Sequence, residues 1–90
     1  MKIKRVTLNG TKTAITFDTK CSKWLVKNFS EDFIYAAYDQ NATEAESAKI
    51  ASGCGQVVIE NEYLGGDAHL TDTIYVTGTG EVEVQQLCYR

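Results

Sequence analysis

The sequence predicts an all-β protein, an antiparallel β-sandwich or small barrel of about seven strands. Three observations support this prediction. Short runs rich in β-branched and aromatic residues recur at roughly 8–12-residue spacing. Glycine and asparagine separate these runs, and the chain contains no proline. The 90 residues and 43% hydrophobic content suffice for one core, so we expect a single domain over residues 1–90.

The clearest local signal is Asn9-Gly10, which lies between the runs Ile3–Leu8 and Thr13–Phe17. Asn-Gly favours the two positive φ angles of a type I′ turn, whose twist matches that of paired strands. We therefore predict an N-terminal hairpin over residues 2–17, with the remainder of the sandwich over residues 22–88.

Five further strands are predicted after this hairpin, and their short connections favour more hairpins over parallel crossovers. These strands are Lys23–Lys27, Phe33–Tyr38, Gln56–Glu60, Thr73–Thr77 and Glu81–Gln85. Alternation along the strands predicts a core of Ile15, Phe17, Trp24, Val26, Phe33, Tyr35, Val57, Ile59, Ile74, Val76, Val82 and Val84. On the last strand, Val82 and Val84 are expected to face inward, and Glu81, Glu83 and Gln85 are expected to face solvent.

The segment 41–52 is ambiguous. It contains good helix formers, and Asn41 is a candidate cap. Its only large apolar residue is Ile50, so a helix here would bury almost nothing. We expect a loop with about one helical turn.

The net charge of −3 conceals an asymmetry along the chain. Residues 1–30 hold seven basic residues and one acid, whereas residues 31–90 hold two basic residues and eleven acids. Either interleaved strands mix the two parts in space, or a basic and an acidic face attract neighbouring copies head to tail. In the second interpretation, Lys2, Lys4 and Arg5 are the candidate self-association or docking residues. The lysines alternate with apolar residues in an acidic chain, which argues against a nucleic-acid partner.

No pattern of catalytic or metal-ligating residues emerges. Cys21, Cys54 and Cys88 are widely spaced, and His69 is the single histidine. An odd cysteine count without a signal peptide fits reduced thiols. Cys54, in a Gly-Cys-Gly turn, is either a small buried hydrophobe or a reactive thiol. We expect no metal, no cofactor, no enzymatic activity and, since no run is long and apolar enough for a span, no membrane partner.

Aromatic side chains are the other candidates for binding, because sugar-binding surfaces and protein interfaces both use them. Alternation places Tyr38 on the face opposite Tyr35, and Tyr75 on the face opposite its two neighbours. Tyr38 and Tyr75 are therefore a candidate exposed aromatic surface. The alternative is that they cap an edge of the core with their hydroxyls in water.

Over roughly residues 22–88 the chain contains the runs Trp24–Asn28, Ile34-Tyr35, Lys49–Gly53 and Thr73–Val84. This combination resembles small β-rich bacteriophage accessory proteins of the head or tail, such as head fibre, decoration or tail components. The resemblance implies a structural virion protein, assembled in the host cytoplasm, with itself and other virion proteins as partners. It implies no catalytic residues.

The first functional hypothesis is thus a homo-oligomeric phage structural protein that docks on the particle. The alternative is a small carbohydrate-binding or adhesion module that binds a glycan through surface tyrosines and Trp24. A third hypothesis is a thiol-dependent enzyme or regulator at Cys54. An obligate oligomer, a monomer with an aromatic platform, or a reactive thiol would distinguish them.

Overall fold

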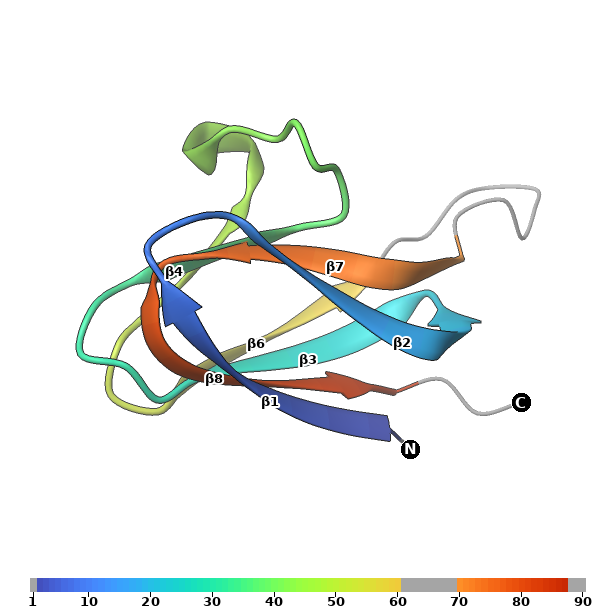
Figure 1. The fold of residues 1–90 in the computed structure, drawn as a ribbon, viewed down its shortest axis with the longest axis horizontal. Coiled ribbons are helices and arrows are strands. Elements are labelled where there is room, and N and C mark those ends of the chain that lie inside the picture. Colours follow the sequence, from blue (N-terminus) through green and yellow to red (C-terminus); the bar gives the residue numbers. More distant parts are fainter. Residues whose placement is uncertain (1, 61–69, 88–90) are drawn as a thin grey trace.

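The computed structural model describes residues 2–60 and 70–87 as two four-stranded antiparallel sheets packed together (Figure 1). The predicted all-β sandwich is therefore confirmed. Sheet A has the strand order β1-β8-β3-β6, and sheet B has the order β2-β7-β4-β5. The elements are β1 (Lys2–Asn9), β2 (Thr13–Cys21), β3 (Lys23–Asn28), β4 (Ile34–Ala37), the 3₁₀ turn η1 (Glu44–Glu46), β5 (Ala48–Ile50), β6 (Gly55–Glu60), β7 (Thr71–Thr77) and β8 (Thr79–Gln86).

Four connections, β1–β2, β3–β4, β5–β6 and β7–β8, cross between the sheets near the left end of the molecule in Figure 1, and the β2–β3 connection crosses at the right end. Because β1 pairs with β8 and β2 with β7, these four strands form one long ribbon that bends from sheet to sheet. Strands β3, β4, β5 and β6 form a second bent ribbon in the same way. Both keep backbone hydrogen bonds through the bend: Gly10 N–H donates to Gly78 O at 2.8 Å, and Cys54 N–H donates to Asn28 O at 2.9 Å.

The predicted hairpin over residues 2–17 is wrong, although both of its strands exist. β1 and β2 lie in opposite sheets and pair with other strands. A type I′ turn needs a positive φ at Asn9, but among the described non-glycine residues only Cys54 has one. Instead, Asn9 Oδ1 accepts bonds from the N–H (3.2 Å) and the hydroxyl (2.7 Å) of Thr11. This local turn leads the chain out of sheet A.

The expectation that the short connections form hairpins is also wrong at the β3–β4 and β7–β8 connections. The loop after β3 and the single residue Gly78 between β7 and β8 each connect strands of different sheets. Here the backbone approaches other segments closely. Gly80 has φ +89°, and a Cβ on it would lie 2.4 Å from Ser30 Cβ. A side chain at this position would therefore force the bend apart.

The segment 41–52 contains the expected single helical turn and also one strand more than predicted. In η1, Glu46 Oε1 accepts bonds from the N–H and hydroxyl of Thr43, so Thr43 and not Asn41 is the cap. β5 then pairs with β4 and places Ile50 opposite Ile34 in the core. Three residues are too few to show an alternating pattern, so this strand could not be predicted from the sequence.

Most of the predicted core is confirmed, but on β4 the residues that face inward are shifted by one position along the chain. Ile34 and Ala36 are buried, whereas Phe33 is 51% exposed and Tyr35 faces outward. The run Phe33–Tyr38 is apolar on both of its faces, so alternation alone does not decide which face is inside. Val57 and Ile59, also expected in the core, pack at its margin. Among residues 2–60 and 70–87, the buried hydrophobic side chains are Leu8, Ile15, Phe17, Cys21, Trp24, Val26, Ile34, Ala36, Ile50, Ile74, Val76, Val82 and Val84.

The side chain of Asn28 holds the second ribbon together at its bend. It is fully buried, and Nδ2 donates to the carbonyl oxygens of Asp32 (2.8 Å), Ile50 (3.2 Å) and Ala51 (3.1 Å). Its Oδ1 accepts from the N–H (2.9 Å) and hydroxyl (2.6 Å) of Ser30. One amide therefore satisfies polar groups of both turning segments, 29–33 and 51–54, away from water.

We predict that Asn28→Asp, which conserves volume, destabilises the fold by about 3 kcal/mol or more. The substitution turns the donor group toward three carbonyl oxygens into an acceptor. Urea denaturation followed by the fluorescence of buried Trp24 measures the change. Asn9→Asp, at an exposed turn, is the matched control and should cost less than about 0.5 kcal/mol. Equal effects of the two variants would contradict this role for Asn28.

Candidate functional site

Lys2, Lys4 and Arg5 do not form one basic surface. They alternate along β1, so Lys2 and Lys4 point to one side and Arg5 to the other. Lys2 and Lys4 reach across to β2, where Lys2 forms an ion pair with Asp18. Arg5 points to the outer face of sheet A and pairs with Glu83. These contacts split the predicted docking residues between two sides of the molecule.

Ion pairs join the basic and acidic parts of the chain. Lys23 Nζ lies 3.8 Å from Glu60 Oε1, and Lys27 Nζ lies 3.6 Å from Glu83 Oε2. Each pair links a base from residues 1–30 to an acid from residues 31–90. The interleaved strands therefore mix the two parts in space, which is the first of the two interpretations of the charge asymmetry.

The outer face of sheet A, called the A face below, carries a row of three aliphatic residues and one glutamine that crosses all four strands and is called the apolar row below. Ile3 on β1 lies opposite Gln85 on β8, which lies opposite Leu25 on β3, which lies opposite Val58 on β6. Ile3 and Val58, at the two edges of the sheet, are 53% and 48% exposed. Sequence alternation identified each strand separately, but only the register brings these residues into one row.

The neighbouring row places one carboxylate between two cations: it contains Arg5, Glu83, Lys27 and Gln56. Glu83 Oε1 accepts from Arg5 Nε at 3.0 Å, and Glu83 Oε2 accepts from Gln85 Nε2 at 2.7 Å. The bonds from Gln85 and Arg5, with the charge of Lys27, hold the pKa of Glu83 below its usual value against the opposing effect of burial. Glu83 faces outward as predicted, yet its neighbours leave it only 5% exposed.

Tyr38 and Tyr75 do not share a surface, so the predicted exposed pair is wrong. Tyr38 packs against the core, and its hydroxyl donates to Ile59 O at 2.8 Å. Burial, with a smaller effect from the charge of Glu60, raises the pKa of Tyr38 well above its ordinary value. Tyr75 lies between buried neighbours on β7 and faces outward. The one-residue displacement of β4 turns Tyr38 inward and Tyr35 outward.

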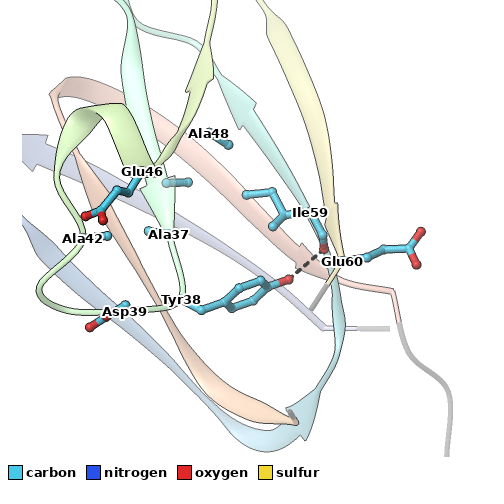
Figure 2. Close-up of a pocket in the computed structure, with 9 residues that line it drawn as sticks. Ala37, Tyr38, Asp39, Ala42, Glu46, Ala48, Ile59 and Glu60 are labelled. Carbon is cyan, nitrogen blue, oxygen red and sulfur yellow. Dashed lines mark hydrogen bonds between the residues drawn. The ribbon is translucent and has the colours of Figure 1, made fainter. Parts of the chain in front are cut away.

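A cleft of about 430 Å³ lies beside Tyr38 (Figure 2). Its floor is apolar, and its polar lining consists of Tyr38 and three acids, Asp39, Glu46 and Glu60. Asp39 and Glu46 accept hydrogen bonds from their own connection, and Figure 2 shows the Glu60 carboxylate directed away from the tyrosine ring. Lys12 fixes the outer wall, since its Nζ donates to two carbonyl oxygens of residues 40–42 at 2.7 Å each. The cleft therefore lies between the β4–β5 connection and β6.

The outer face of sheet B carries two half-buried tyrosines, Tyr35 and Tyr75. Tyr35 lies opposite Thr77, and Tyr75 lies opposite Ala37, so the two tyrosines are diagonal neighbours on one face. Phe33, two residues before Tyr35, is 51% exposed, and Lys49 Nζ lies 4.2 Å from the centre of its ring. Trp24, by contrast, is fully buried and takes no part in any surface. An aromatic platform exists, but it consists of Tyr35 and Tyr75.

The expectation of reduced thiols is wrong for Cys21, which is buried, and the burial considered for Cys54 is also wrong. Cys21 is disulfide-bonded, and Cys54 is free and exposed at a positive φ of 69°. His69 and Cys88 lie outside the described residues. Within residues 2–60 and 70–87, no group of three His, Cys, Asp or Glu side chains is placed to hold a metal ion. No helix in that part of the chain is long and apolar enough to cross a membrane.

The fold and its surfaces define a small antiparallel β-sandwich with a mixed-charge face on sheet A and an aromatic platform on sheet B. Comparisons with protein-family models, curated proteins and solved structures find no match. The function is therefore argued from these two surfaces and from the resemblance noted in the sequence.

The lowered pKa of Glu83 predicts how its contacts affect stability as pH changes. A carboxyl group with a depressed native pKa contributes stability above its ordinary value of 4.5, and this contribution is lost as pH falls through the native pKa. We expect Glu83→Gln to melt at a lower temperature than the native chain at pH 7, with the gap narrowing by pH 3. Glu81→Gln, exposed on the same strand, is the matched control and should show no such narrowing. A gap that persists at pH 3 would contradict the ionic origin.

Proposed function

We propose that this protein is a structural component that self-associates and docks onto a larger particle, of the bacteriophage head or tail accessory kind that its sequence resembles. Such a protein acts by surface contact, without catalysis or a cofactor. Its partners are further copies of itself and other virion proteins, and its place is the virion.

The A face is the observation that carries this proposal. Half-exposed aliphatic side chains at both edges of one sheet face, in register with a third on a central strand, favour burial against a protein surface. The charges beside the row are already paired within the chain, so covering them leaves no carboxylate or ammonium unmatched. The outer strands of this sheet also contain no proline, which leaves the edges flat enough for close approach.

We predict that the native chain forms a discrete oligomer and that Val58→Lys raises its dissociation constant about tenfold or more, because a cation then enters an apolar contact. Light scattering over a concentration series measures this change. Ala14→Lys, exposed on the outer side of sheet B, is the matched control and should leave the mass unchanged. A monomer at every concentration would remove self-association from the proposed function.

A second candidate function, glycan binding, is favoured by the pair Tyr35 and Tyr75. Two tyrosines that are diagonal neighbours on one sheet face suit the apolar faces of sugar rings, and Thr73 and Thr77 lie on the same strand and side as Tyr75. The platform lies on sheet B and leaves the A face free.

Glycan binding predicts that Tyr75→Ala abolishes calorimetric heat with any glycan that binds the native chain in an array screen. Tyr38→Phe keeps the aromatic ring, which packs against the core, and should retain the affinity. Equal loss in both variants, or no glycan bound at millimolar concentration, would exclude this platform as a sugar site.

A further inference from the structure

We infer that the partner of the A face is a second copy of this chain, packed sheet against sheet about a two-fold axis parallel to the strands. The inference rests on the self-association in the proposed function and specifies its surface and geometry. A two-fold contact requires one patch that is complementary to itself. The register of sheet A allows this requirement to be checked residue by residue.

The apolar row satisfies the requirement. A two-fold axis along the strands, between the central strands β8 and β3, places β1 of one copy over β6 of the other. Ile3 then meets Val58 of the second copy, and Leu25 meets Gln85, each contact occurring twice. The two most exposed aliphatic side chains of the A face thus cover each other. The amide of Gln85 stays bonded to Glu83, and its methylene groups face the leucine.

The charged row satisfies the requirement under the same axis. Glu83 comes to lie over Lys27 of the second copy, and Arg5 over Gln56, so no like charges meet. A two-fold axis across the strands would instead set Lys27 against Lys23 of the second copy, and it would do so twice. Like charges in contact oppose association, so the charge pattern selects the axis parallel to the strands.

The net charge of the A face also suits a second copy. Its outward charged side chains are three cations and three anions: Arg5, Lys23, Lys27, Glu60, Glu81 and Glu83. The whole chain carries −3, so two copies repel on average but not through this face. Pairing here also leaves sheet B of both copies outward, available to a further partner.

Disulfide trapping tests the geometry. In a Cys54→Ser background, which removes the exposed thiol, the double variant Ile3→Cys with Val58→Cys should form a covalent dimer under mild oxidation on a non-reducing gel. Within one chain the two positions are three strand spacings apart, roughly 14 Å, and a disulfide requires Cα atoms within about 7 Å. Any bond between them is therefore between copies. Val58→Cys with Ala14→Cys is the matched control and should stay monomeric on the gel.

Each outcome decides the inference. A covalent dimer from the double variant, with none from Ile3→Cys or Val58→Cys alone, supports the axis parallel to the strands. Dimers from either single variant would overturn it, because the same residue would then meet itself. An oligomer by light scattering without trapping by the double variant would overturn the inference but leave the proposed self-association standing. A monomer by light scattering would overturn both.

Discussion

The side-chain amide of Asn28 is the contact on which the architecture depends. Two turning segments, 29–33 and 51–54, cross between the sheets, and their hydrogen bonds to Asn28 are buried or partly buried. One amide supplies donors to three carbonyls and an acceptor to Ser30, so the second ribbon bends without orphaned polar groups. The first ribbon makes the same bend through Gly10 and Gly78. The positions of these bends determine which strands belong to the same sheet. They therefore also determine which side chains lie on the same face.

The A face is a product of this bend. Because the bent ribbons meet along β8 and β3, residues from the first, middle and last parts of the chain come into register on one surface. Glu83 neutralises part of the positive charge of Arg5 and Lys27 within the sheet, which lets charged side chains lie beside an apolar row without facing a partner unpaired. This local neutralisation is what makes the face compatible with a second copy and with the proposed structural role.

The errors of sequence-based prediction fall on positions where local signals compete with tertiary contacts. Asn9-Gly10 has strong hairpin composition, yet its strands gain more by pairing with β8 and β7 at the other end of the chain. Phe33–Tyr38 is apolar on both faces, so the sequence does not show which of its residues face inward. In the structure Tyr38 faces inward, and Tyr35 takes its place as the outward tyrosine of the candidate binding surface. Glu83 reads as an exposed carboxylate on its own strand, and only its neighbours from β1 and β3 cover it.

The sequence by itself determined the all-β class, every strand except β5 and most of the inward residues, because alternating side chains and turn residues are local properties of a strand. For β3, β6 and β8 it also determined which side chains point outward, but for β1 the structure decided this. The tertiary structure alone decided which strands pair, that the first two lie in opposite sheets, and that Ile3, Leu25 and Val58 form one row. Pairing is a competition among non-local partners for backbone hydrogen bonds and buried area, and no run of neighbouring residues encodes its outcome.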